Sequence, residues 1–218
     1  MKNIISLILT IVFINTLYGQ KEYSISFDKD DFTFKESENG YYILLDDNNY
    51  FLLEDTTLPA LPYISVNILI PEDTDIENIS VAKTEMEILK NVNIASNPPL
   101  MPTSGLFQQA TSKVTYTEDK YPDENVQLQS KNTMQGFTFV SFIVCPFIYN
   151  VKEKNLTMIT NFDISFDVID ATSTKSETAI TKRYDMEDVI TNLVINSSEL
   201  SSLYTTKSTA LKSISSET

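Results

Sequence analysis

The chain has 218 residues, of which 30 are acidic and 16 basic, giving a formal net charge of −14. It contains no histidine and a single cysteine. Ser-His and Cys-His catalytic pairs are therefore excluded, and zinc sites lose nearly all their usual ligands. The acidic balance, with no basic stripe, also disfavours nucleic acid as a partner. No internal disulfide can form, so stability must come from a hydrophobic core.

The N-terminus has the pattern of a secretory signal. Lys2 supplies a positive charge, residues 4–14 are apolar, and Leu17-Tyr18-Gly19 precedes Gln20 as a plausible cleavage site. This apolar run is much shorter than the roughly 20 residues that a membrane helix needs. We therefore expect residues 1–19 to be a signal peptide cut between Gly19 and Gln20. We also expect a secreted, periplasmic or cell-surface protein without a transmembrane segment.

The mature part of the chain alternates apolar and polar residues with a period of two far more often than with a helical period. Its segments are rich in the β-branched and aromatic residues that strands favour. They predict an all-β fold, an antiparallel, jelly-roll-like β-sandwich of about eight to ten strands. The segments are residues 23–27, 41–45, 50–53, 63–70, 79–86, 126–128, 137–148 and 162–169.

Two of these features predict more detail. Phe137–Val144 is apolar almost throughout, which is typical of a central strand covered on both faces, and Cys145 beside it is expected to be buried. Residues 46–49, Asp-Asp-Asn-Asn, lie between two apolar runs and predict a hairpin turn.

After Asp170 the chain becomes rich in serine and threonine, and strand alternation ends. We therefore divide the mature chain into a sandwich domain, residues 20–170, and a linker or tail, residues 171–218. Residues 186–194 and 198–204 have short helical patterns within this tail. Without a docking partner in the chain, the tail is expected to be partly disordered.

A series of proline-containing blocks gives the chain a family resemblance. In this order and setting, the blocks resemble the N-terminal propeptide domain of the gingipain-like cysteine peptidases, the C25 peptidase family. The resemblance covers roughly residues 21–169. It implies a β-sandwich module that is not an enzyme, needs no cofactor, keeps a secreted protease inactive and assists its folding. The blocks are residues 58–62 leading into a strand that ends at Ile70-Pro71, then residues 79–85, 98–102, 121–122 and 136–150, followed by Leu156 and residues 164–168.

The resemblance also implies a partner and a mode of action. The partner would be a gingipain-like cysteine peptidase, inhibited in cis or in trans. Since gingipain specificity pockets prefer a basic side chain, an extended loop should place one there. The stretch from Ser104 to Asn132 is the expected donor, with Lys113 and Lys120 as the candidate inhibitory residues. Arg183, in the tail, is the candidate processing site.

One other interpretation of the function remains open from the sequence. The chain could be an exported β-sandwich used for binding or adhesion, without a protease partner. A propeptide fold should place Pro62 and Pro146 at strand ends near a protein-binding face, whereas an adhesin should show a ligand groove or a calcium cluster. Acidic groups such as Asp28, Asp30 and Asp31 could supply oxygen ligands, but they lack a calcium-loop signature, so we expect ordinary exposed turns and no metal.

Overall fold

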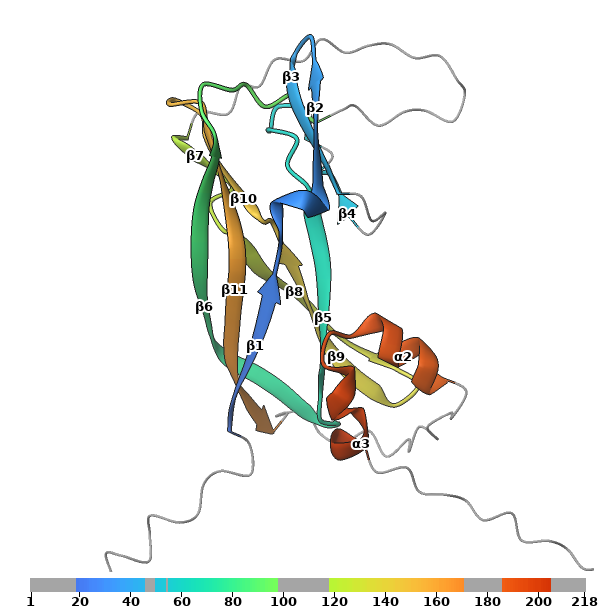
Figure 1. Cartoon of the computed structure of the whole chain (residues 1–218). Coiled ribbons are helices and arrows are strands. Elements are labelled where there is room, and N and C mark those ends of the chain that lie inside the picture. Colours follow the sequence, from blue (N-terminus) through green and yellow to red (C-terminus); the bar gives the residue numbers. More distant parts are fainter. Residues whose placement is uncertain (1–18, 46–49, 54, 98–117, 171–185, 205–218) are drawn as a thin grey trace, which may run out of the picture.

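The computed structural model describes residues 19–45, 50–53, 55–97, 118–170 and 186–204 (Figure 1). Strands dominate these residues, and the helices other than the short η1 lie near the C-terminal end. The strands are β1 (Gln20–Ser26), β2 (Phe32–Ser37), β3 (Gly40–Leu45), β4 (Tyr50–Phe51), β5 (Tyr63–Ile70), β6 (Thr74–Leu89), β7 (Lys120–Tyr121), β8 (Val126–Met134), β9 (Phe137–Val144), β10 (Phe147–Asn150) and β11 (Asn155–Asp170). The helices are η1 (Lys29–Asp31), α2 (Glu187–Leu193), η3 (Ser197–Glu199) and α3 (Leu200–Leu203).

The strands form two main antiparallel sheets and a separate hairpin. In the first sheet, β6 pairs with β11 along nearly its whole length, and β10 and β1 share the other edge of β11. β7 lies beyond β10. The second sheet has the order β4-β5-β9-β8, and β2 pairs with β3 as a two-stranded ribbon. The predicted antiparallel β-sandwich is confirmed.

The core lies between the two sheets. Val140, Phe142 and Val144 point from β9 into a buried cluster that also contains Phe162 and Phe166 of β11. Full burial of an aromatic or aliphatic side chain of this size contributes about 1.5–3 kcal/mol. This cluster therefore joins the sheets, as the alternation in the sequence predicts.

Strand β9 is buried on both of its faces, which confirms the prediction of a central strand. Phe137 and Phe139 point away from the sandwich core and pack against the helical segment, together with Ile190 and Tyr204. An almost uninterrupted apolar strand is stable here because helices cover the face that the other sheet does not.

The helical candidates in the tail are confirmed, but the expectation that they have no docking partner is wrong. Ile190 and Val194 are buried against β9 and β5, so residues 186–204 are part of the folded structure. We call these residues the C-terminal clasp. None of the described helices is long and apolar enough to cross a membrane.

The predicted hairpin around residues 46–49 is also wrong. Those residues lie outside the described ones, but the flanking strands belong to different pairings, because β3 pairs with β2 and β4 pairs with β5. The predicted strand 137–148 is divided in two at Cys145-Pro146, so that β9 and β10 enter different sheets. Pro62 and Pro146 each stand directly before a strand, as expected.

Substitution of Phe142 tests the central core. Phe142 is completely buried, and Phe142→Ala should lower the free energy of unfolding by about 3–5 kcal/mol, because it removes contacts and leaves a cavity. Leu128→Ala is the control, since Leu128 is 45% exposed and its removal should change stability by about 0.5 kcal/mol or less. Urea denaturation measures both. Equal effects would contradict the assigned core.

Candidate functional site: the base of the segment 98–117

The two chain ends that flank residues 98–117 lie at the same end of the molecule. Residues 92–97 lead out to this segment and residues 118–122 return from it. We call these two stretches together the loop base. Figure 1 shows β7 and the β2–β3 hairpin at this end, and the C-terminal clasp toward the other. The loop base includes residues 118–122, the first described residues of the stretch 104–132 that was expected to carry inhibitory lysines; the end of that stretch lies in β8.

The outgoing side of the loop base is held by the β2–β3 hairpin. The Tyr41 N–H donates to Asn93 O at 2.8 Å, and the Ala95 N–H donates to Tyr41 O at 3.0 Å. Gly40 makes this approach possible: its φ is +123°, and a Cβ there would lie 2.5 Å from Asn93 O. Any other residue would push the hairpin away from the outgoing chain.

The proline-containing block at residues 58–62 holds the same stretch through a second set of backbone hydrogen bonds. The Ala60 N–H donates to Ala95 O at 2.7 Å, and the Asn97 N–H donates to Leu58 O at 3.0 Å. The Asn97 side chain, 2% exposed, also donates through Nδ2 to Asp55 O. Residues 58–60 thus run beside the outgoing chain, with an isolated antiparallel bridge between Pro59 and Ser96, and β5 begins shortly after them at Tyr63.

The returning side is held by β10. The Val151 N–H donates to Asp119 O at 2.9 Å, and Lys120 and Tyr121 pair with Asn150 and Tyr149. The Tyr121 side chain is 5% exposed, and its hydroxyl accepts a hydrogen bond from the Tyr63 hydroxyl at 2.9 Å. Burial raises the pKa of Tyr121, which favours the neutral form of its hydroxyl.

Tyr149 connects the two sides. Its backbone pairs with Tyr121 on the returning side, and its hydroxyl donates to Val92 O on the outgoing side at 3.0 Å. Burial raises the pKa of this hydroxyl, while a hydrogen bond with the Ile94 backbone acts in the opposite direction. One residue therefore contacts both chains that flank residues 98–117, one through its backbone and the other through its side chain.

An open hollow of about 540 Å³ lies beside the returning side. Its wall carries both charges, from β6 and from residues 118–123, with Ile148 and Pro122 as apolar parts. Asn125, at its floor, accepts from Lys83 Nζ and donates to Cys145 O and Phe147 O. Asn125 thus has partners within the protein, and the hollow is an open surface depression with both charges on its wall.

The site residues expected from the sequence are distributed as follows. Lys120 lies in β7 and lines the hollow, with its backbone held in the sheet. Lys113 and Arg183 lie outside the described residues. Gly19 is exposed, and Gln20 is the first residue of β1, so the folded strand begins where the mature chain was expected to begin.

The acidic clusters have structural partners. Asp28 and Asp31 form a capping box on η1, in which each side chain accepts a backbone N–H at the helix start. The Ile76 N–H and Lys131 lower the pKa of Asp75. Among the described residues, no group of three or more acidic or cysteine side chains could hold a metal ion.

Cys145 is a buried structural residue. It is fully buried between β9 and β10, and its Sγ donates to Phe147 O at 3.5 Å. Burial raises the pKa of its thiol to about 12. Since the thiolate is the nucleophile, this side chain has no catalytic character in the folded protein.

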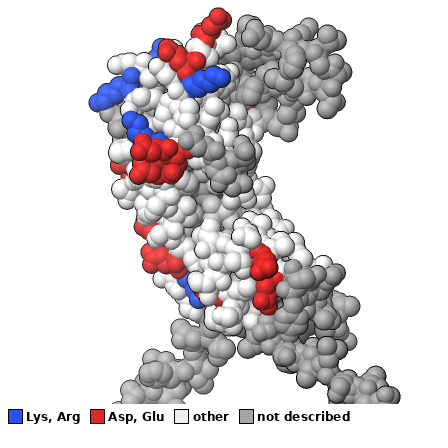
Figure 2. All heavy atoms as spheres, turned by 45° about the vertical axis from the view of Figure 1, so that its right-hand side comes forward, with Lys and Arg blue, Asp and Glu red and all other residues white. Residues whose placement is uncertain are grey.

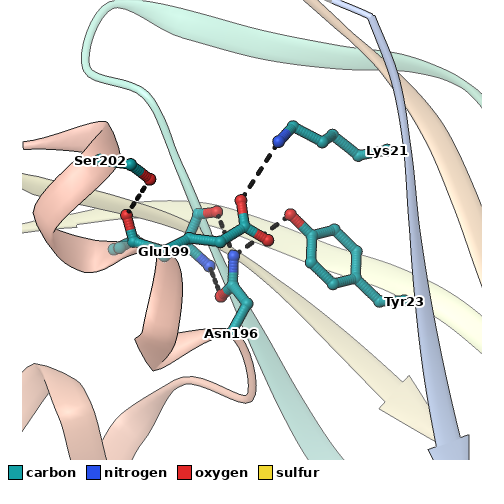
Figure 3. Close-up of polar contacts among 6 residues, drawn as sticks. Lys21, Tyr23, Asn196, Glu199 and Ser202 are labelled. Atoms are coloured by element: carbon teal, nitrogen blue, oxygen red, sulfur yellow. Dashed lines mark hydrogen bonds and ion pairs between the residues drawn. The ribbon is translucent and has the colours of Figure 1, made fainter.

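The C-terminal clasp binds both β1 and β5 through polar contacts (Figure 3). Asn196, 5% exposed, accepts the Leu69 N–H at 2.8 Å and donates to Leu69 O at 3.0 Å and to the Tyr23 hydroxyl at 3.2 Å. Glu199 pairs with Lys21 at 3.2 Å. Burial, and then the Glu199 carboxylate, raise the pKa of Tyr23. The clasp thus satisfies backbone groups of β5 that no strand pairs.

The face of the molecule drawn in Figure 2 has no basic patch among its described residues. Figure 2 shows acidic side chains in separate groups along this face, with lysines among them mainly in the upper half and a largely uncharged middle. This distribution fits the expectation of a solvated acidic surface.

Comparison with known families identifies the fold. Residues 48–195 match the model of the C25 propeptides, Propeptide_C25. The chain belongs to this family. The matched range includes α2, so the C25 propeptide fold extends through the first helix of the C-terminal clasp.

Two solved structures show the same C25 propeptide fold. A chain in the complex of the Porphyromonas gingivalis RgpB pro- and mature domains aligns with a TM-score of 0.57 and 17% identity, covering 85% of this chain and 95% of that one. A chain in a structure concerning the zymogenic latency of gingipain K, from the same organism, aligns with a TM-score of 0.55 and 19% identity. This alignment covers 72% of this chain and 90% of that one. Comparison with curated proteins gives no match.

Thiol labelling tests the environment of Cys145. Because the folded pKa is raised from 9.0 to about 12, the thiol favours folding below pH 9, and this contribution is lost as the pH rises toward 12. At about pH 8, Ellman's reagent should react only at the rate of global unfolding, and fully in denaturant. Fast labelling of the native protein would contradict this burial.

Asn196→Ala tests the C-terminal clasp. It leaves the Leu69 N–H and C=O without their partner, which should lower the free energy of unfolding by about 2–4 kcal/mol. Asn192→Ala is the matched control, since Asn192 is exposed and bonds to Asp188 O within its own helix, and should cost about 0.5 kcal/mol or less. Similar losses measured in urea would contradict a specific role for Asn196.

Proposed function

We propose that the mature chain is a non-catalytic, exported C25 propeptide domain that inhibits a gingipain-like cysteine peptidase and assists its folding, in cis or in trans. The observation that carries this proposal is the loop base: a C25 propeptide fold that holds both ends of the segment containing Lys113. The RgpB complex adds support, because in it a chain of this fold occurs with a mature domain.

The geometry of the loop base suits an inhibitor. Backbone hydrogen bonds on two sides fix residues 93–97, and sheet pairing fixes residues 120–121. An inhibitory segment gains affinity when its ends are fixed before binding, because less conformational entropy is lost on docking. A rigid base is therefore the arrangement that a tight competitive inhibitor needs.

Lys113 and Lys120 are the proposed inhibitory residues. A peptidase pocket that accepts a basic side chain would take one of them as a substrate-like group. Lys120 projects from β7 at the loop base, whereas Lys113 belongs to the segment that the base holds. Along the sequence, Lys120 thus lies within the loop base and Lys113 lies outside it. Single variants will separate their contributions to inhibition.

The mode of linkage decides how strong the inhibition must be. A propeptide joined to its peptidase acts at a high effective concentration, whereas a released one depends on its own affinity. Arg183 is the proposed processing site. It precedes the C-terminal clasp in sequence, so cleavage there would separate the strands from the clasp along the chain but would leave their noncovalent contacts in place.

Inhibition assays test this function. Replacing both Lys113 and Lys120 with alanine should raise the inhibition constant toward a C25-family peptidase from the same source by about 100-fold, since each buried charged contact is worth a few kcal/mol. The assay follows hydrolysis of peptides cleaved after lysine or arginine. The matched control replaces Lys29 and Lys35, which are exposed lysines outside the stretch, and should inhibit like the wild type.

Two results would count against the proposal. Unchanged inhibition in the Lys113 and Lys120 double variant would remove these residues from the mechanism. Absence of inhibition, and of any gain in peptidase refolding, by the wild-type chain against every C25 peptidase of its source would overturn the function itself.

A further inference from the structure

We propose that the flank of the sandwich between β6 and β8 binds a second, extended segment of the peptidase, one that carries apolar and basic side chains. This inference rests on the proposed function and adds a contact outside the active site of the peptidase. Both strands are edge strands: among the described strands, β6 pairs only with β11 and β8 only with β9 (Figure 1).

Two lysines connect these edge strands across the flank. Lys131 of β8 reaches β6, where its Nζ donates to Thr74 O at 3.1 Å and to the Asp75 carboxylate at 3.2 Å. Lys83 of β6 reaches in the opposite direction and donates to Asn125 Oδ1, just before β8, at 3.3 Å. The strands therefore run side by side between these two contacts.

Between the lysine contacts, the inner faces of both strands reach the surface. In β6, Val81 pairs with the completely buried Ile164. In β8, Leu128 pairs with Phe142, which is also completely buried. Because directly paired residues share one face of a sheet, Val81 and Leu128 lie on the core side, yet they are 37% and 45% exposed. Ile79, two residues before Val81, is 40% exposed, and we call these three residues the flank seam.

The opposite flank of the sandwich is covered by the chain itself. There the C-terminal clasp binds both β1 and β5 through Asn196 and Glu199. The clasp has no counterpart among the described residues at the flank seam, where three large apolar side chains remain exposed. Exposed apolar side chains on neighbouring edge strands are typical of a surface that another chain covers.

The charges around the flank seam indicate the chemistry of its partner. The hollow of about 540 Å³ adjoins the seam, because Lys83 and Asn125 end the seam and also line the hollow. Lys83 pairs with Glu85 at 3.4 Å, and Lys131 pairs with Asp75, so these two lysine charges are balanced within the protein. The acidic side chains along the seam and the hollow are Asp75, Glu77, Glu85, Glu118, Asp119 and Asp123.

These acidic groups outnumber the lysines of the same surface, even when Lys152, the partner of Asp119, is included. An apolar seam that leads into an acidic hollow is complementary to an extended segment with apolar side chains followed by a basic one. Extended segments bind to exposed sheet edges in many complexes, with side-chain pockets that give specificity.

Lys120 connects this surface with the peptidase. It lines the hollow and is one of the two proposed inhibitory residues, so a peptidase that accepts Lys120 comes to lie beside the hollow. A second copy of this chain is less complementary, because it would bring a formal net charge of −14 to an acidic surface. The occupant is therefore a segment of the peptidase.

Charge substitutions in the flank seam test this contact. The double variant Ile79→Lys with Leu128→Lys loses apolar contacts and repels a basic partner. It should raise the inhibition constant about tenfold toward the C25 peptidase that the wild type inhibits. Val189→Lys is the matched control, since Val189 is 46% exposed on α2, and it should stay within about twofold of the wild type.

Glutamate at the same two positions tests the sign of the partner's charge. It removes the same apolar contacts but attracts a basic segment, so this variant should weaken inhibition less than the lysine variant does. Both variants should melt within about 3 °C of the wild type, because the substituted side chains are exposed.

A peptidase with a covalently blocked active site isolates the seam contact. The lysine double variant should bind this blocked enzyme about tenfold more weakly than the wild type does, whereas Val189→Lys should bind it as the wild type does. This readout does not depend on occupancy of the specificity pocket, so it separates the seam from the inhibitory lysines.

Several results would overturn the seam contact and leave the proposed function intact. They are normal inhibition by the lysine variant, and an equal or greater loss in the glutamate variant. A wild-type dimer in analytical ultracentrifugation that the lysine variant dissociates would assign the seam to a second copy instead. A large fall in the melting temperature of the lysine variant would show that this chain itself covers the seam. If the wild type neither inhibits nor assists any peptidase, the proposed function fails, and the seam contact fails with it.

Discussion

The architecture depends on the pairing of β11. One edge of this sixteen-residue strand is occupied by β6, and the other is divided between β10 and β1. Through β10, the strand supports the loop base, and through β1 it reaches Lys21 and Tyr23, which the C-terminal clasp contacts. A single long strand therefore connects the loop base with the C-terminal clasp, while its inward-facing phenylalanines join it to the second sheet.

The two ends use different kinds of interaction. At the clasp, the Asn196 side-chain amide hydrogen-bonds to both backbone groups of Leu69. These bonds take the place of pairing with a neighbouring strand along this part of the β5 edge. At the loop base, backbone pairing and buried tyrosine hydroxyls fix the two chains that flank residues 98–117. The sheets and the clasp stabilise the domain, whereas the proposed function assigns recognition to the stretch that contains Lys113 and Lys120.

Much of the fold follows from local sequence, whereas the loop base does not. Alternation predicted β5 with its observed bounds, and the apolar run of β9 predicted its two-sided burial. The turn composition of residues 46–49 led to a wrong hairpin prediction, because turn composition does not specify which strands pair. Asn97, Tyr121 and Tyr149 were missed, since single polar groups in apolar surroundings acquire a role only through contacts between distant segments. The proline motif at residues 58–62 marked the region, but its partner, residues 95–97, is visible only in the fold.

The central claim is that the mature chain occupies the active-site region of a C25 peptidase through the stretch that contains Lys113 and Lys120. The most direct measurement is binding of the mature chain to that peptidase before and after its active site is blocked by a covalent lysyl-peptide inhibitor. The account predicts that blocking the site weakens binding strongly, because the two ligands compete for one pocket. Undiminished binding to the blocked enzyme would contradict it, since the chain would then dock elsewhere.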